Sequence, residues 1–243
     1  MSTERGYSGV DNLDAMVDAA NYNQFLVREL VRHGGSSRRL LDFGAGTGTF
    51  ARNLKDRGFD VVCVEQDPLL QAELRRLNFE CHASLATVPL QSIDFIFSLN
   101  VLEHIEDDAA VLGAMRERLK PDGRLYLYLP AFNLLYSSMD RKVGHFRRYR
   151  IRPLVQLLRR TGFHVSQASY ADSLGFLVTL LYQVVGNRRG DLNPRALRLY
   201  DQAIFPVSRL LDRVLGRVLG KNVWVVASPL AINESPNENK AAT

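Results

Sequence analysis

Cysteine is scarce in this sequence, with only Cys63 and Cys81 among 243 residues. Both lie in apolar, strand-like stretches, so we expect two buried thiols and no disulfide. Neither belongs to the closely spaced cysteine and histidine pairs that bind structural zinc. The chain also has no internal repeat, and its length suits one large domain or one domain with an insertion.

Long apolar runs are missing as well. The segment Leu174–Val185 is mostly apolar but has only a dozen residues, whereas a membrane-spanning helix needs about 20. The polar segment Met1–Asp14 lacks the basic and then apolar pattern of a secretory signal. With 46% apolar and 23% charged residues, the composition is that of a soluble globular protein. We therefore expect a cytoplasmic location.

Positive charge is in excess, at a formal net charge of +5, and most of the excess is local. Arginine and lysine gather between positions 141 and 160, and further arginines occur from 188 to 217. Such a patch favours an anionic partner, and the candidates are a phosphorylated substrate, a membrane surface and a nucleic acid. The alternative is a solvated basic face that has no ligand.

Short apolar strands alternate with helical segments along the chain. The predicted strands are Arg39–Phe43, Asp60–Val64, Phe79–His82, Ile93–Leu99, Arg124–Leu129, Phe163–Tyr170 and Asn222–Ala227. Glycine, proline and polar residues separate them from helices whose apolar residues recur three and four positions apart. This order predicts an α/β fold with a Rossmann-like, doubly wound and mainly parallel sheet.

Five regions are expected along the chain. A helical cap at 1–35 precedes an α/β core at 36–170. About 50 residues of helical pattern at 171–220 form an insertion before the last core strand at 221–229. The segment 230–243 is rich in Asn, Ser, Pro, Glu and Lys and is predicted to be a disordered tail.

The strongest motif is the run Asp42-Phe43-Gly44-Ala45-Gly46-Thr47-Gly48 at the end of the first strand. Glycines let the backbone bend tightly and let a ligand touch the main chain. The spacing is Gly-x-Gly-x-Gly rather than the Gly-x-Gly-x-x-Gly of dinucleotide folds, so the ligand need not contain phosphate. Glu65 directly follows the second strand, where it can accept hydrogen bonds from both ribose hydroxyls of a nucleoside.

With these motifs the chain resembles class I S-adenosylmethionine (SAM)-dependent methyltransferases, over Leu40 to about Tyr170. The resemblance includes the glycine loop, Glu65, the segment Ile93–Ile105 and the segment Leu119–Arg124. It implies SAM as the cofactor and a seven-stranded sheet whose last strand is antiparallel. The motifs are specific for the superfamily but not for a substrate.

The resemblance also implies roles for individual residues. The glycine loop would hold the methionine part of SAM, Glu65 the ribose, and the turn containing Ser84 would lie near the adenine. Asn100 would contribute through its backbone. The expected cofactor-binding residues are Asp42, Gly44, Ala45, Gly46, Gly48, Glu65, Gln66, Ser84 and Asn100.

Tyr22 and His104 are further catalytic candidates. In similar enzymes the N-terminal helix closes over SAM, so Tyr22 either lines the methyl channel or only packs the helix down. His104 follows the fourth strand, at the sheet edge where ligands bind. Some methyltransferases have a metal-binding Glu-x-x-Glu-His pattern there, but Asn100 replaces the first acid here. The adjacent Glu103 and His104 could face one ion only across a distorted backbone or a loop, so we predict no metal site.

The segment Tyr136–Arg150 is the least generic, and its Gly-His-x-Arg-Arg-Tyr element is similar to one in a bacterial subgroup of these enzymes. His145 can titrate near neutral pH and take a proton from a hydroxyl nucleophile. Arg147 and Arg148 can pair with a phosphate or carboxylate, and Tyr149 can donate a hydrogen bond or stack on a ring. We predict substrate contact, the alternative being a basic loop that only packs.

The helical insertion has an amphipathic pattern. Apolar residues from Val207 to Leu219 share one helical face, and Arg209, Arg213 and Arg217 repeat every four residues on another. Such a helix can lie in a membrane interface, although a lid on the core or a dimer surface is commoner. Membrane contact through 171–220 would suggest a lipid-linked or otherwise hydrophobic acceptor. The oligomeric state stays open.

These features predict a methyltransferase that uses SAM to methylate a small-molecule or lipid- or sugar-linked acceptor. The basic patch favours an anionic acceptor, and the simplest acceptor atom is oxygen. Because the methyl donor is already activated, the protein mainly supplies alignment and exclusion of water. A nicotinamide-dependent oxidoreductase and a non-catalytic SAM-binding or membrane-associated protein are the alternatives. A nucleic-acid substrate is disfavoured because Asn100 is followed by Val101-Leu102 and not by an element that holds a flipped base.

Overall fold

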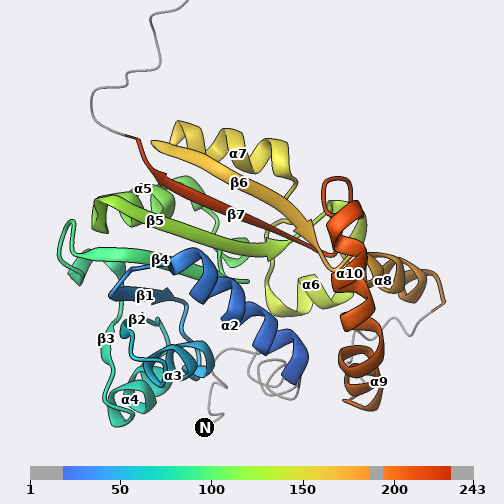
Figure 1. The fold of residues 1–243 in the computed structure, drawn as a ribbon, viewed down its shortest axis with the longest axis horizontal. Helices are drawn as coiled ribbons and strands as arrows, with labels where there is room; N and C mark the ends of the chain where they lie inside the picture. The colour runs from blue at the N-terminus through green and yellow to red at the C-terminus, as the bar shows by residue number, and fades with distance from the viewer. Residues whose placement is uncertain (1–18, 186–193, 231–243) are drawn as a thin grey trace, which may run out of the picture.

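The computed structural model describes residues 19–185 and 194–230, which form a sheet with helices on both faces (Figure 1). The sheet has the strand order β3-β2-β1-β4-β5-β7-β6. The strands are β1 (Arg39–Phe43), β2 (Asp60–Val64), β3 (Glu80–His82), β4 (Ile93–Leu99), β5 (Leu119–Pro130), β6 (Phe163–Ala171) and β7 (Asn222–Pro229).

The strand directions confirm the predicted fold class. Strands β1 to β5 pair in parallel, whereas β7 is antiparallel to both of its neighbours, β5 and β6. The sequence predicts β1, β2 and β4 with the bounds that the structure has. Strand β5 begins earlier than expected, at Leu119 instead of Arg124, because Leu119 pairs with Ile93 ahead of an irregularity in the register.

The two faces of the sheet have separate apolar cores. Leu40 and Leu41 are neighbours in β1, and they belong to different clusters because side chains alternate across a strand. One face is covered by α2 (Ala20–Gly34), α3 (Thr49–Lys55) and α4 (Pro68–Arg76), and the other by α5 (Asp108–Arg118) and α7 (Ile151–Arg160). Both faces are therefore buried, as in other parallel sheets.

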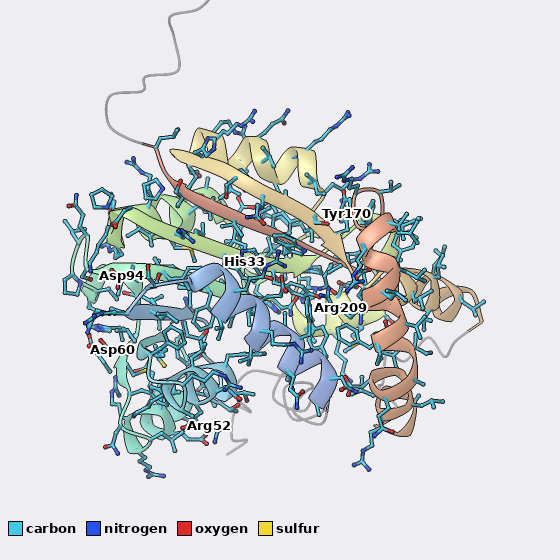
Figure 2. The ribbon with its side chains drawn as sticks, in the orientation of Figure 1. His33, Arg52, Asp60, Asp94, Tyr170 and Arg209 are labelled. Atoms are coloured by element: carbon cyan, nitrogen blue, oxygen red, sulfur yellow. The ribbon has the colours of Figure 1, made fainter. Side chains whose placement is uncertain are left out.

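Helix α2 lies across the sheet and is held by aromatic stacking. His33 is buried, with its ring centroid 5.5 Å from that of Tyr126 and 5.3 Å from that of Trp224. Figure 2 shows His33 between the helix and the strands, and Arg209 between α2 and α10. The Arg209 guanidinium lies 3.6 Å from the centroid of the Phe25 ring.

The insertion between β6 and β7 is helical, as predicted. It contains α8 (Ser173–Val185), α9 (Pro194–Leu199), a π-helical turn η4 (Tyr200–Ile204) and α10 (Phe205–Leu215). The buried Asp201 accepts hydrogen bonds from the backbone N–H groups of Asn21 and Tyr22, at 3.0 and 2.9 Å. The insertion thus caps the N-terminus of α2, 180 residues away in sequence.

Short elements follow the carboxyl ends of the strands and form one edge of the molecule. They are η1 (Leu85–Thr87) after β3, η2 (Leu102–His104) after β4, and η3 (Asn133–Leu135) and α6 (Ser138–Val143) after β5. Ligands of open α/β sheets bind along this edge. Residues 1–18 of the predicted helical cap and residues 231–243 of the predicted tail lie outside the described residues.

Candidate active site

The glycine loop between β1 and α3 has a backbone that requires glycine. Gly44, Gly46 and Gly48 have φ angles of 80°, 54° and 76°, which lie in the left-handed region. A Cβ atom on Gly44 would lie 2.4 Å from Cγ2 of Val101, and one on Gly48 would lie 2.7 Å from Cδ2 of Leu74. Only glycine lets the loop pack this closely against the segment that follows β4.

Glu65 lies beside the mouth of this loop. Its Oε2 accepts a hydrogen bond from the Gly46 N–H at 2.8 Å, and its Oε1 accepts one from the Asp67 N–H at 3.0 Å. The side chain of Gln71 donates to the Glu65 carbonyl at 2.9 Å. The half-exposed carboxylate is therefore fixed where a ribose above the loop would meet it.

Asp42 is the buried acid beneath the loop. The side chain is 3% exposed, and its Oδ2 has no hydrogen-bond partner among the described residues. Burial and the nearby Glu65 charge raise the pKa of Asp42 to about 8. A positively charged donor above the loop would satisfy this carboxyl group, and the ammonium group of SAM is such a donor. The residues present therefore fit the cofactor.

The other predicted cofactor residues lie along the same edge. Ala45 is buried in the loop, while Gln66 follows β2 and Ser84 begins η1, both exposed. Asn100 follows β4 with a φ of 54°, and its N–H donates to the Tyr128 carbonyl at 2.8 Å. The structure thus gathers residues from three strand ends around one loop.

Tyr22 reaches the same edge from helix α2. Its ring makes edge contacts with Phe205, at 5.4 Å between centroids, and with Tyr128, at 6.1 Å. Burial raises the pKa of the Tyr22 hydroxyl well above its usual range, and Asn100 is one of its hydrogen-bonding neighbours. The residue therefore packs the helix down and also brings a polar atom to Asn100.

A polar cluster forms around Asp140 in helix α6. Asp140 is 1% exposed, and its Oδ1 lies 2.8 Å from Nδ1 of His145. Arg148 donates to both carboxylate oxygens, from Nε at 2.8 Å and from Nη2 at 3.0 Å. Burial alone would raise the pKa of Asp140, but the hydrogen bonds from His145 and Arg148 hold it well below its usual range. The imidazole of His145 is therefore held in one orientation.

The other residues of the Gly-His-x-Arg-Arg-Tyr element mostly contact the protein. Arg147 pairs with Asp108 at 2.8 Å and also donates to the Glu106 carbonyl at 2.7 Å. Tyr149 is buried, and its hydroxyl lies 3.1 Å from Oδ2 of Asp108. With Arg148 bound to Asp140, both the second arginine and the tyrosine act within the fold. The sequence predicts substrate contact for all three side chains, and in the structure they pair with Asp108 and Asp140.

Glu103 and His104, in η2, lie beside His145. Glu103 is fully buried, its Oε1 is 3.8 Å from Nε2 of His145, and burial raises its pKa to about 8. The rings of His104 and His145 are 4.5 Å apart between centroids, and burial followed by the charge of His145 lowers the pKa of His104 to about 4. One ligand atom from each residue lies within 4.8 Å of the others. In this tight turn the adjacent Glu103 and His104 both reach one shared space, which is the exception that the sequence argument allows for a loop.

Sequence reasoning missed Asp140, the residue that organises this cluster. A signal for it exists, because Ser137 and Asp140 have the Ser-x-x-acid spacing of a capping box, which α6 forms. The basic residues around it predict substrate contact, and their acidic partner lies within the same segment. Only the fold shows that one carboxylate serves both the helix cap and two side chains of the motif.

The insertion leaves a row of apolar side chains exposed. They are Leu177, Val178 and Leu181 on α8 and Val207, Leu210, Leu211, Val214 and Val218 on and after α10. Arg213 and Arg217 are also exposed. Among the described residues, none of the helices combines the length and the apolar character that crossing a membrane requires.

Comparison with known proteins identifies the family. The model of the methyltransferase domain matches residues 18–168, which contain the glycine loop, Glu65 and the Asp140 cluster. The chain belongs to the class I SAM-dependent methyltransferase superfamily. The predicted cofactor, SAM, is that of the family, and the alternative of a nicotinamide-dependent oxidoreductase is set aside.

Individual relatives cover part of the chain. A methyltransferase of Mycobacterium tuberculosis is 31% identical over 132 residues, which are 52% of this chain and 49% of that protein. The ubiquinone biosynthesis O-methyltransferase of Idiomarina loihiensis is 30% identical over 116 residues, or 44% of each chain. This chain thus spans about half the length of the curated relatives it matches.

The fold as a whole is similar to solved methyltransferases. A 1,6-didemethyltoxoflavin-N1-methyltransferase from Burkholderia thailandensis, bound to S-adenosylhomocysteine, has a TM-score of 0.58 at 16% identity. The similarity covers 92% of this chain and 84% of that one, and it includes most of the sheet and its helices. At this identity the likeness concerns the fold.

Proposed function

We propose that this chain transfers the methyl group of SAM to a hydroxyl oxygen of a small-molecule or lipid- or sugar-linked acceptor. The observation that carries the proposal is the Asp140–His145 pair at the active edge of the sheet. With Nδ1 held by Asp140, Nε2 of His145 can accept the proton of an acceptor hydroxyl. A poorly acidic hydroxyl needs such a base, whereas a neutral amine does not.

The curated relatives give limited support for oxygen as the acceptor atom. Two groups of similar proteins are described, one as methyltransferases without a stated substrate and one as ubiquinone biosynthesis O-methyltransferases. The exposed cations that surround the Gly-His-x-Arg-Arg-Tyr element extend the proposal to an anionic acceptor. Around it, Arg141, Lys142, Arg150 and Arg152 are exposed and can attract a phosphate or carboxylate.

Cofactor binding is tested by calorimetry with SAM and S-adenosylhomocysteine. Glu65→Ala should weaken binding of both by about tenfold, which is about 1.4 kcal/mol, because the ribose loses its acceptor. Glu73→Ala, which removes an exposed carboxylate from α4, is the matched control and should bind as wild type does. Equal binding by the two variants would remove Glu65 from the site.

The acceptor atom is tested with SAM that carries a ¹³C-methyl group. Paired acceptors that differ only in a hydroxyl or an amino group, such as phenol and aniline or glucose and glucosamine, are compared by NMR of the product. We expect methyl ethers, and we expect His145→Gln to slow their formation about 10²- to 10⁴-fold. His164→Gln, at an exposed position in β6, is the control. Methylated amines as the sole products would refute the proposal.

We also propose that the exposed apolar row of α8 and α10 contacts membrane lipid, so that a lipid-linked acceptor can enter. Val214 is 74% exposed. Arg213 and Arg217, which lie close to it in sequence, are also exposed and can meet anionic headgroups. Val214→Asp should reduce sedimentation with phosphatidylcholine vesicles containing phosphatidylglycerol. The control is Leu69→Asp on α4, where the leucine is 79% exposed. If both variants sediment with the vesicles as strongly as the wild-type protein does, a membrane role is contradicted.

A further inference from the structure

Three potential metal ligands converge from two separate segments of the chain. Glu103 and His104 come from the turn η2, and His145 comes from the loop after α6, about 40 residues later. The two segments are joined by the Phe146 N–H, which donates to the Glu103 carbonyl at 2.8 Å. The fold thus places two imidazoles and one carboxylate in contact at the active edge, with their ligand atoms within 4.8 Å of one another.

Each histidine of this group makes a hydrogen bond to a residue outside it. Nδ1 of His145 lies 2.8 Å from Asp140, and His104 hydrogen-bonds to the backbone of Val143. Histidines that bind metals commonly donate their second N–H to a carboxylate or a backbone carbonyl in this way. In the shared space Nε2 of His145 faces Glu103 Oε1 at 3.8 Å, and a ring nitrogen of His104 lies within 4.8 Å of the ligand atoms of both.

The burial of the Glu103 carboxylate has no compensating interaction within the described part of the protein. It is fully buried, and neither oxygen has a hydrogen-bond partner in another described residue. A buried acid without a partner is costly. Ligand atoms around a tetrahedral zinc ion lie about 3.4 Å apart, given bond lengths near 2.0–2.1 Å. The 3.8 Å between Glu103 Oε1 and His145 Nε2 is close to that spacing.

We propose that Glu103, His104 and His145 bind one divalent transition-metal ion, and that Zn²⁺ matches this set of two imidazoles and one carboxylate. Such a set leaves a fourth position open, as in other zinc sites with three protein ligands. The ion occupies the lone pair of His145 that would otherwise accept a proton. If His145 is the base of the proposed function, an ion bound to it inhibits methyl transfer to hydroxyl acceptors. This inhibitory role therefore rests on the proposed function.

Binding is tested directly, without any turnover. The full chain, free of a histidine tag and treated with a chelator, is titrated with Zn²⁺ by calorimetry and with Co²⁺ by visible absorption. We expect one ion per chain with micromolar or tighter affinity, and a tetrahedral Co²⁺ spectrum. Glu103→Gln and His104→Ala should each weaken binding at least tenfold, and Asp140→Asn by about 10- to 100-fold. His164→Ala, which removes an exposed histidine elsewhere, should bind as wild type.

Binding of SAM to each variant, measured by calorimetry, shows that the fold is intact. The metal site is refuted if wild type binds no stoichiometric ion, or if folded Glu103→Gln and His104→Ala variants bind as wild type does. These results do not depend on any acceptor.

The inhibitory role has its own test. Hydroxyl methylation by chelator-treated protein should fall as Zn²⁺ is added, with a midpoint at the dissociation constant found by calorimetry, and it should return with EDTA. Unchanged or faster turnover at saturating Zn²⁺ would refute inhibition. Absence of hydroxyl methylation in chelator-treated protein would refute the proposed function and leave the binding result in place.

Discussion

The substitution Asp42→Asn should raise the stability of the cofactor-free protein and weaken SAM binding. In the structure, Oδ2 of Asp42 is buried and has no hydrogen-bond partner among the described residues. An unsatisfied buried polar group costs about 1–3 kcal/mol, more when charged. Asparagine keeps the shape of the side chain and cannot ionise. Above pH 7 we expect the free energy of unfolding to rise by about 1–3 kcal/mol, and the melting temperature by about 2–4 °C per kcal/mol.

The pH dependence gives this prediction its sign. The pKa of Asp42 is raised from 3.8 to about 8 in the folded protein. Between pH 3.8 and about pH 8 the folded state keeps a proton that the unfolded state has released. The free energy of unfolding is therefore highest below pH 3.8 and falls as the pH rises towards 8. The slope from this one group is at most about 1.4 kcal/mol per pH unit. The advantage of Asp42→Asn over wild type should therefore grow from pH 5 to pH 8.

The affinity for SAM should change in the opposite direction. A hydrogen bond to a charged group contributes about 1.5–3 kcal/mol, so its loss should weaken binding at least tenfold. Urea unfolding at pH 5 and pH 8, together with calorimetry of SAM binding, measures both effects on the same variant. A variant whose stability relative to wild type is the same at both pH values, or whose affinity for SAM is unchanged, would refute the reasoning.

Three further predictions concern the packing around the site. Gly44→Ala should lower the free energy of unfolding by about 1–3 kcal/mol, because the new methyl group meets Val101; adding Val101→Ala should recover part of this loss in urea unfolding. Asp201→Ala should cost about 1 kcal/mol in the same assay, since α2 loses its cap; an unchanged midpoint would contradict the capping role. Arg148→Lys should lower the melting temperature, because a lysine cannot donate to both oxygens of Asp140.

The central part of the sheet is predictable from sequence because its strands are apolar and are followed by glycine, glutamate or asparagine. Strands β1, β2 and β4 have the predicted bounds, and Glu65 lies beside the glycine loop as expected from its place after β2. Helix α6 is not predicted because it lacks an apolar face. It depends on the capping box of Ser137 and Asp140, and it ends at Gly144, whose φ is 80°.

The roles within the Gly-His-x-Arg-Arg-Tyr element are less predictable. Residue type shows that Arg148 and Tyr149 can bind an anion or a ring, but not that they are buried. Their partners, Asp140 and Asp108, lie 8 and 41 residues away. Such pairs form only once the chain after β5 folds back over η2, so the sequence indicates the chemistry of these side chains but not which atoms they meet.

The position of β7 has a consequence for synthesis on the ribosome. Strands β5 and β6 share no hydrogen bonds, and both pair with β7, which ends at Pro229, 99 positions after the end of β5. At a synthesis rate of about 5–20 residues per second, about 5–20 s pass between completion of β5 and completion of its partner β7. During that interval the nascent chain presents the unpaired edge of β5 and, once it is made, that of β6, and these edges can pair with other chains. Chaperone dependence should therefore be greatest for ribosome-bound chains that stop before Asn222.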